Sequence, residues 1–112
     1  MDCLFCKIAA GGLPATVVAE SARTIAFRDV NPQAPTHVLV IPKDHYPDLA
    51  ALPGAGGGLL DELVALAHKA AEADGTGGAY RVVFNTGADA GQTVFHAHAH
   101  VLGGRPMAWP PG

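Results

Sequence analysis

The chain has 112 residues, a length that accommodates one domain with one hydrophobic core. Hydrophobic residues make up 49% of the sequence and charged residues 15%, which excludes an intrinsically disordered chain. The net charge of -3 excludes a globally basic surface, and no apolar run approaches the ~18 residues of a membrane span. The first residues also lack the basic start and apolar core of a signal peptide. We therefore expect a single cytoplasmic domain over residues 1–112, with neither nucleic acid nor a membrane as its partner.

The first half of the chain predicts one short helical turn and three strands. Residues 3–10 form the turn, which ends at two glycines followed by a proline. Two short apolar runs, residues 16–19 and 24–27, are separated by a polar segment and predict a β-hairpin. A loop with two prolines, residues 29–35, leads into the continuous apolar run 37–41. That run predicts a strand that is buried on both faces.

The next part predicts the main helix and a fourth strand. Residues 46–52 are expected to form a short helix, and the glycine-rich residues 53–58 a loop. Apolar residues recur every three or four positions over residues 59–71, which indicates a long amphipathic helix. Residues 80–85 then predict a strand, and residues 87–91 a tight loop.

Half of the six histidines lie in one segment, residues 94–102, where His96, His98 and His100 alternate with alanine. The flanking residues are β-branched, aromatic or aliphatic, so the segment predicts a strand. Successive side chains of a strand point to opposite faces, so the three imidazoles are expected to share one face. The other face would carry the residues between and beside them: Phe95, Ala97, Ala99 and Val101.

The order of these elements predicts an α+β fold. Short connections early and late in the chain favour an antiparallel sheet of about five strands, with the long helix packed on one face and a short helix in addition. No glycine-rich dinucleotide-binding motif lies between a strand and a helix.

Three adjacent imidazoles predict a site for proton transfer, nucleophilic attack or metal binding. The unperturbed imidazole pKa of ~6.5 allows a neutral ring to act as a nucleophile and a protonated ring to donate. Neighbouring rings resist being charged together, which separates these two roles. Asn85 and Thr93 offer polar groups nearby, and Gly87 and Gly91 allow the backbone to approach a ligand closely. This combination suits a phosphoryl group.

Three separate segments resemble one family, the histidine-triad proteins. Residues 91–102 resemble its His-x-His-x-His signature, and residues 29–37 resemble its ribose-side loop. Residues 103–112 resemble the C-terminal tail of its nucleotide-binding, Hint-like branch, the purine nucleoside phosphoramidases. The resemblance implies a histidine-triad fold and a homodimer in which the tail, with Trp109, reaches toward the partner's site. It implies a purine nucleoside monophosphate and its phosphoramidates as ligands.

The same resemblance implies roles for individual residues. His98 would attack the α-phosphorus and form a nucleotidyl-histidine intermediate, which water hydrolyses. His100 would lie against the phosphate, His37 would be a supporting proton carrier, and His96 would complete the triad. Asp29 would accept hydrogen bonds from the ribose hydroxyls. The implied substrate-binding residues are Asp29, Val30, Asn85, Gly91, Gln92, Thr93 and Ala99.

The pair Cys3-x-x-Cys6 has the spacing of half a zinc site. The resemblance to zinc-binding members of the family implies His45 and His96 as the other two ligands. Zinc would then be structural and would remove His96 from acid–base chemistry, while the reaction itself would require no cofactor. The alternative is a pair of reduced, partly buried cysteines.

Three other functions compete with a phosphoramidase. One is a dinucleoside polyphosphate hydrolase, the sister branch that usually carries glutamine where Asn85 stands. The second is a nucleotide-binding adaptor with vestigial activity. The third is a metal hydrolase in which the three histidines hold the ion. His68, on the long helix, is assigned no role.

Overall fold

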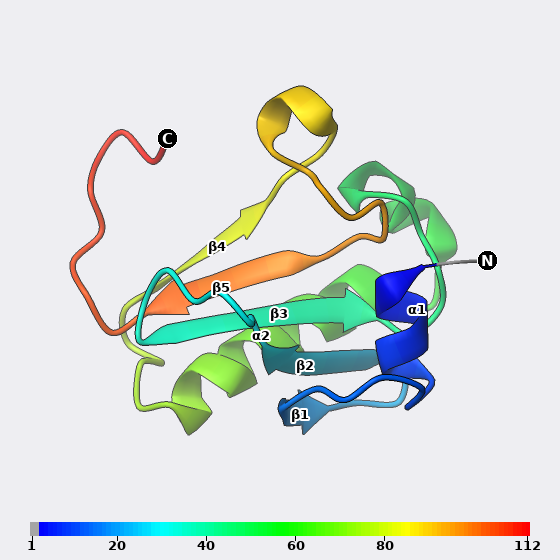
Figure 1. Cartoon of the computed structure of the whole chain (residues 1–112), viewed down its shortest axis with the longest axis horizontal. Helices are drawn as coiled ribbons and strands as arrows, with labels where there is room; N and C mark the ends of the chain where they lie inside the picture. Colours follow the sequence, from blue (N-terminus) through cyan, green and yellow to red (C-terminus); the bar gives the residue numbers. More distant parts are fainter. Residues whose placement is uncertain (1–2) are drawn as a thin grey trace.

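A five-stranded antiparallel sheet in the order β1-β2-β3-β5-β4 forms the centre of the computed structural model, which describes residues 3–112 (Figure 1). The strands are β1 (Val17–Glu20), β2 (Thr24–Arg28), β3 (Thr36–Pro42), β4 (Tyr80–Phe84) and β5 (Ala99–Gly103). The α-helices are α1 (Leu4–Ala9) and α2 (Leu59–Ala73), and the 3-10 turns are η1 (Leu49–Ala51), η2 (Pro53–Ala55) and η3 (Ala88–Ala90). The α+β fold and the hairpin of β1 and β2 are confirmed.

The long helix α2 covers one face of the sheet (Figure 1). Its buried residues recur every three or four positions: Leu59, Leu63, Leu66, Ala67, Ala70 and Ala71. The alanines are small, so the C-terminal half of the helix can pack closely on the strands. The carboxylates of Asp61 and Glu62 lie in the first turn, where they interact favourably with the positive end of the helix dipole.

The short helix α1 covers part of the opposite face. Its buried residue Phe5 packs with apolar side chains of β2 and β3, among them Phe27 and Leu39. All seven residues of the central strand β3 are buried, as predicted for a strand covered on both faces. Val38 and Val40 point toward α2, and Leu39 points toward α1. The sheet therefore separates a helix-packed layer from a layer that α1 covers only in part.

The histidine-rich segment corrects the sequence prediction in its first half. A strand was expected over residues 94–102, but the ladder begins only at Ala99. The backbone N–H of Ala97 donates to the Tyr46 carbonyl at 2.7 Å instead of to a neighbouring strand. Phe95, expected on the same face as Ala97, Ala99 and Val101, is 54% exposed, whereas those three residues are buried. Residues 94–98 are thus an irregular segment that leads into β5.

The reason for this late start lies in β3. Its last residue is Pro42, which has no N–H to donate and pairs with Thr24 on the β2 side. The Pro42 carbonyl accepts a hydrogen bond from the His96 ring, so it is not free to pair with a neighbouring strand there. A side chain therefore takes the bond that a strand backbone would have made.

Smaller differences concern the short elements. The helix expected over residues 46–52 is reduced to the 3-10 turn η1, whose N-cap Asp48 makes no side-chain capping bond. The expected loops 53–58 and 87–91 contain the further turns η2 and η3.

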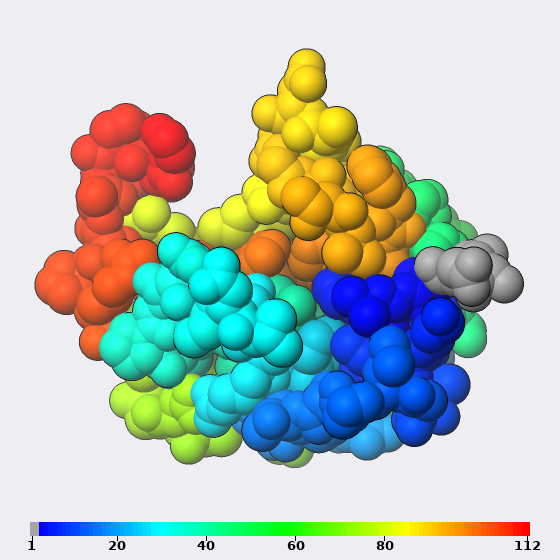
Figure 2. Space-filling model, viewed as in Figure 1, coloured from blue at the N-terminus to red at the C-terminus, as the bar shows by residue number. Residues whose placement is uncertain are grey.

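The C-terminal tail extends away from the body of the molecule (Figures 1 and 2). The Arg81 guanidinium donates to the Ala108 carbonyl at 2.9 Å, and Trp109 is 82% exposed. Among the described residues no single helix is long and apolar enough to cross a membrane, although the bent pair Leu49–Ala55 and Leu59–Ala73 passes that test jointly.

Candidate active site

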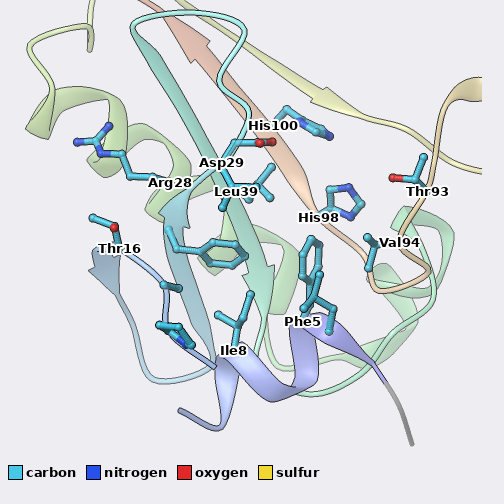
Figure 3. Close-up of a pocket in the computed structure, with 15 residues that line it drawn as sticks. Phe5, Ile8, Thr16, Arg28, Asp29, Leu39, Thr93, Val94, His98 and His100 are labelled. Carbon is cyan, nitrogen blue, oxygen red and sulfur yellow. The ribbon is translucent and has the colours of Figure 1, made fainter. Parts of the chain in front are cut away.

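A pocket of about 590 Å³ opens on the face of the sheet that α1 covers in part. It lies between α1, the loop that follows β2 and the segment before β5; Figure 2 shows these three segments around a recess. One part of the wall is apolar and includes Phe5, Ile8, Phe27 and Leu39. The other part is polar and carries Asp29, Thr93, His98 and His100 (Figure 3). The pocket can therefore take a ligand with a flat apolar end and a polar or anionic end.

The His98 ring has a defined tautomer. Its Nδ1 lies 2.7 Å from the His96 carbonyl oxygen. A carbonyl only accepts hydrogen bonds, so in the neutral ring Nδ1 carries the proton and Nε2 carries the lone pair. The ring of Phe5 meets that of His98 edge-on, with centroids 5.1 Å apart and planes at 89°. The ring is thus fixed by a backbone acceptor and an aromatic neighbour, and it presents an unprotonated nitrogen as a nucleophile.

His37 and His100 form a second set of fixed tautomers. The backbone N–H of Gln33 donates to His37 Nδ1 at 2.9 Å, so in a neutral ring the proton of His37 is on Nε2. That Nε2 lies 2.9 Å from His100 Nδ1, which accepts the bond, and 3.4 Å from the Asp29 carboxylate. His100 Nε2 then carries a proton. The backbone N–H of Gln33 thereby sets which ring nitrogens carry protons in two hydrogen-bonded imidazoles, His37 and His100.

The environment keeps these two rings neutral at neutral pH. Burial, aided by the nearby rings of His98 and His37, lowers the pKa of His100 to about 4, against a smaller opposing effect of Asp29. Burial also lowers the pKa of His37, again opposed by the Asp29 carboxylate. His100 is therefore a neutral hydrogen-bond donor beside the pocket.

A second cluster lies behind the first triad histidine. Four ligand atoms, one each from Cys3, Cys6, His45 and His96, lie within 4.8 Å of one another. His96 Nδ1 is 3.3 Å from the Cys3 sulfur and 3.5 Å from the Cys6 sulfur, and His45 Nδ1 is 3.4 Å from the Cys6 sulfur. The structure thus brings together all four residues of the expected zinc-ligand set.

The donor set fits a tetrahedral zinc ion. With Zn–S near 2.3 Å and Zn–N near 2.05 Å, tetrahedral geometry separates sulfur from nitrogen by ~3.6 Å, close to the distances of the cluster. His96 Nε2 donates to the Pro42 carbonyl at 2.8 Å, so the lone pair of its Nδ1 points toward the sulfurs. Burial, together with a hydrogen bond from Cys3, raises the pKa of the Cys6 thiol. A bound cation would supply the positive charge that a thiolate needs in this place.

The three triad histidines therefore do not converge on one point. His96 groups with the two cysteines, whereas His100 groups with Asp29 and His37. His98 lies between the two groups and faces the pocket. This geometry does not support a metal hydrolase in which the triad itself holds the ion.

The expected substrate-binding residues have different surroundings. Val30 and Thr93 line the pocket, and Val30 is fully exposed. Asn85 does not line it; its amide packs instead beside Gly91, whose φ of +95° favours glycine. These two residues therefore shape the loop before the histidine segment.

Two expected binding side chains face away from the pocket. Ala99 is fully buried among the residues that pack with α2. The Gln92 amide accepts from the Gly87 N–H and donates to the Pro47 and Val94 carbonyls, so its polar atoms are all engaged. Gln92 therefore stabilises the loop, and neither residue is among those that line the pocket.

Sequence reasoning missed the apolar wall that α1 contributes. Phe5 and Ile8 are three residues apart in the expected helical turn, a spacing that places both on one helix face. That spacing could have identified them. The Gln33 N–H, which fixes the His37 tautomer, left no signal because it is a backbone group.

Comparisons with known proteins agree with this geometry. Residues 10–107 match the family model described as the HIT domain. A HIT family hydrolase from Legionella pneumophila Philadelphia 1 superposes with a TM-score of 0.93 at 50% identity, covering 99% of this chain and 100% of that one. An uncharacterized HIT-like protein of Synechocystis is 50% identical over 99% of this chain and 97% of its own length. A 14 kDa zinc-binding protein of Zea mays is 46% identical over 97% of this chain and 87% of its own length. The match over most of the chain, together with the fold, shows that the chain belongs to the HIT domain family.

Proposed function

We propose that this HIT domain protein is a purine nucleoside phosphoramidase that forms a covalent nucleotidyl intermediate on His98. The main observation that supports this proposal is the hydrogen bond from His98 Nδ1 to the His96 carbonyl. In the neutral ring this bond leaves Nε2 unprotonated beside a pocket of about 590 Å³. A hydrolase of the same family shares half of its residues with this chain, which supports hydrolysis as the class of reaction.

The pocket accommodates the three parts of a nucleoside 5'-phosphoramidate. The base fits the apolar wall that Phe5, Phe27 and Leu39 line. The ribose hydroxyls donate to the Asp29 carboxylate, which otherwise accepts one backbone N–H at 2.8 Å, from Asn31. The phosphate then lies among the polar groups near His98.

In the first step the lone pair of His98 Nε2 forms a bond to phosphorus and the P–N bond breaks. The leaving nitrogen takes the electron pair of that bond together with a proton from solvent, because an amine leaves only when it is protonated. The neutral His100 donates its Nε2–H to a phosphate oxygen, and the Thr93 hydroxyl donates near the leaving group. The His96 carbonyl stabilises the positive charge that develops on the His98 ring, as a fixed acceptor does for a catalytic imidazole.

In the second step a water oxygen attacks phosphorus and the bond to His98 Nε2 breaks. The nucleoside monophosphate leaves, the proton of the water passes to solvent, and the ring returns to its neutral tautomer. The two steps divide one displacement into two, which is the general advantage of covalent catalysis. No step requires a metal ion.

The cluster of Cys3, Cys6, His45 and His96 is proposed as a structural zinc site. Its donor chemistry and spacing support this, as does the similarity to a zinc-binding protein of Zea mays. Zinc would hold the thiolates and the two imidazoles, and it would supply a tie between α1 and the sheet.

We also propose that the protein is a homodimer. Val82 is 38% exposed on β4, an edge strand of the sheet, and the exposed Trp109 belongs to the extended tail. A second copy that covers both apolar side chains would explain their exposure. Sedimentation equilibrium should give twice the chain mass; a monomer at micromolar concentration would contradict this proposal.

The test of the proposed activity is His98→Ala with adenosine 5'-phosphoramidate as substrate. We expect kcat/KM to fall by about three decades or more, because the covalent route is lost. His68→Ala, on the exposed side of α2, should leave the rate unchanged. Rapid quenching of the wild-type reaction in alkaline denaturant, in which the P–N bond to imidazole survives, should trap an adenylyl group on His98, detected by mass spectrometry.

A small loss in His98→Ala would contradict the mechanism. If the wild-type protein binds AMP but shows no detectable turnover, the result would instead support the adaptor function. Activity that persists in the presence of a chelator would agree with a reaction whose chemical steps use no metal ion.

A further inference from the structure

Helix α1 contributes to two sites at once. Its N-terminal end carries Cys3 and Cys6 of the metal-ligand cluster, and the two residues between them, Leu4 and Phe5, line the pocket. We infer that cation occupancy of this cluster positions the His98 ring and the α1 wall of the pocket, and is therefore coupled to nucleotide binding. The nucleotide half of this inference rests on the proposed function; the effect on the ring does not.

The position of α1 depends on few contacts. The helix has six residues, far fewer than an isolated helix needs for stability in water. Among its own residues only Phe5 is buried, and Cys3, its N-cap, accepts the Cys6 N–H on its sulfur. A cation bound by both sulfurs and by His45 and His96 would join α1 to two loops of the sheet. Without it, the apolar contacts of α1 with the sheet come from the buried Phe5 and the partly buried Ile8 and Ala9.

The first connection to the nucleophile runs through the Phe5 ring. This ring meets that of His98 edge-on with centroids 5.1 Å apart (Figure 3), and it also contacts the rings of His96 at 6.0 Å and of Phe27 at 5.6 Å. Phe5 thus lies between the ligand His96 and the nucleophile, and it is flanked in sequence by ligands. Any shift of α1 moves the ring that limits the His98 orientation, so Phe5 is a positioning residue.

The second connection runs through the backbone of residues 96–98. The His96 ring is held by the Pro42 carbonyl on one side and by the cluster on the other, and the His96 carbonyl accepts the His98 proton. The next N–H, of Ala97, donates to the carbonyl of Tyr46, the neighbour of the ligand His45. Because the β5 ladder begins only at Ala99, these bonds and the two imidazole ligands fix the segment.

A ligand that orders α1 and residues 96–98 makes binding of the second ligand less costly. By linkage, the cation must then raise nucleotide affinity by the same factor as the nucleotide raises cation affinity. The cation touches neither the substrate nor the reacting atoms in this scheme. It acts only through the side chains and backbone that it fixes.

Cobalt(II) provides a test, because its visible absorption reports thiolate coordination directly. We expect saturating AMP to tighten Co²⁺ binding by about fivefold or more, and Zn²⁺ to tighten AMP binding, measured by calorimetry, by an equal factor. Phe5→Ala retains all four ligands, so Co²⁺ should still bind, but the coupling factor should fall toward one. Phe5→Leu, which keeps the helix packed, should give an intermediate factor.

Val30→Ala is the matched control. Val30 also lines the pocket, on a loop that carries none of the four ligands of the Cys3, Cys6, His45 and His96 cluster. The substitution should weaken AMP binding to the apo and metal-loaded forms by the same ratio and leave the coupling factor unchanged. Loss of coupling in Val30→Ala, with coupling retained in Phe5→Ala, would overturn the assignment to α1.

A second measurement needs no nucleotide. The His98 Nδ1–H proton should give a slowly exchanging NMR signal in the Zn²⁺-loaded protein, and this signal should broaden or disappear after chelation and in loaded Phe5→Ala. An unchanged signal after chelation, or Co²⁺ affinity that AMP does not alter while AMP binds, would overturn the inference. If AMP binds neither form, the proposed function is wrong, and the ring signal alone decides the inference.

Discussion

The two ends of the histidine segment have the same residue type but different chemistry. The Nδ1 atom of His96 lies 3.3 Å and 3.5 Å from two cysteine sulfurs, which are soft ligands suited to zinc. His100 accepts from His37 next to the Asp29 carboxylate, in a set of nitrogen and oxygen atoms suited to hydrogen bonding and proton control. The difference shows that sequence spacing brings imidazoles together, whereas their partners decide what each ring does.

The backbone accounts for this division. His100 lies within β5, opposite Leu39 of β3 and Val83 of β4, so its ring leaves the sheet in a regular direction. His96 lies in the irregular segment before the strand, where its ring turns to the Pro42 carbonyl and the cysteines. His98 stands at the transition and faces the pocket. One regular strand would not have separated the three rings in this way.

The largest expected effect on stability is that of removing His96, the ring next to the two sulfurs. His96 is fully buried and both of its ring nitrogens have partners, so His96→Ala leaves a cavity and an unpaired Pro42 carbonyl. We expect it to lower the free energy of unfolding by about 3 kcal/mol or more, measured by urea denaturation. His68→Ala, which removes an exposed histidine, should change it by less than about 0.5 kcal/mol. Equal effects of the two substitutions would remove the distinction between a buried ligand and a surface histidine.

The next largest effect is a loss of stability at acid pH, caused by protonation of His100 at the other end of the segment. The folded-state pKa of His100 is about 4, below its ordinary value of 6.5, so the unfolded chain binds more protons between these values. Stability from this group is present above pH 6.5 and is lost as the pH falls from 6.5 to about 4; His37 adds to the loss because its pKa is also lowered. Asp74, whose pKa is lowered from 3.8 by its bond to Arg28, contributes only at still lower pH.

The measurement is the urea midpoint at several pH values between 7 and 4. The wild-type midpoint should fall across this range, by less than the loss in His96→Ala, because the His100 ring is only partly buried and solvent screens its charge. His100→Gln should flatten the curve between pH 6.5 and 4.5. An unchanged slope in that variant would mean that other groups carry the pH dependence.

The sequence allowed the sheet, the long helix and the four cluster ligands to be predicted, because each has a strong pattern. The periodicity of α2, the apolar run of β3 and the pair Cys3-x-x-Cys6 are such patterns. The resemblance to the histidine-triad proteins added His45 and His96, which the pair alone did not identify. These features depend on residue type and spacing, which a sequence contains.

What could not be predicted depends on single backbone groups. The late start of β5 follows from the Pro42 carbonyl, and the His37 tautomer follows from the Gln33 N–H. The side-chain partners of Gln92 are likewise backbone groups, those of Gly87 and Val94 nearby and of Pro47 far away in sequence. Alternation also placed Phe95 on one face with Ala97, Ala99 and Val101, because a strand was assumed where none forms; Phe95 is exposed and the other three are buried.

A smaller effect, on the rate of reaction, is expected from breaking the hydrogen bond between His37 and His100. His37→Gln removes the N–H that fixes the His100 tautomer while keeping a polar side chain in β3. We expect kcat for adenosine 5'-phosphoramidate to fall by about tenfold, the value of one hydrogen bond of ~1.4 kcal/mol, with little change in Co²⁺ affinity. His68→Gln is the matched control on α2. A change in Co²⁺ affinity as large as that in kcat would mean that the two ends of the segment are not separate.

The smallest effect concerns Asn85, which touches neither end. Its amide lies 3.6 Å from the position that a Cβ on Gly91 would take, so the loop before the histidine segment packs on it. Asn85→Gln adds one methylene, which moves the amide past Gly91 toward the region where a leaving group would lie. The sister branch of dinucleoside polyphosphate hydrolases usually has glutamine at this place.

We therefore expect Asn85→Gln to raise the ratio of kcat/KM for diadenosine polyphosphate over that for adenosine 5'-phosphoramidate. The change should be at most about tenfold, because a single hydrogen bond is gained or lost. Asn31→Gln, in the exposed turn after β2, is the control for an added methylene on an amide. If the ratio is the same in both variants, Asn85 does not select the leaving group, and its packing on Gly91 is then a matter of loop stability alone.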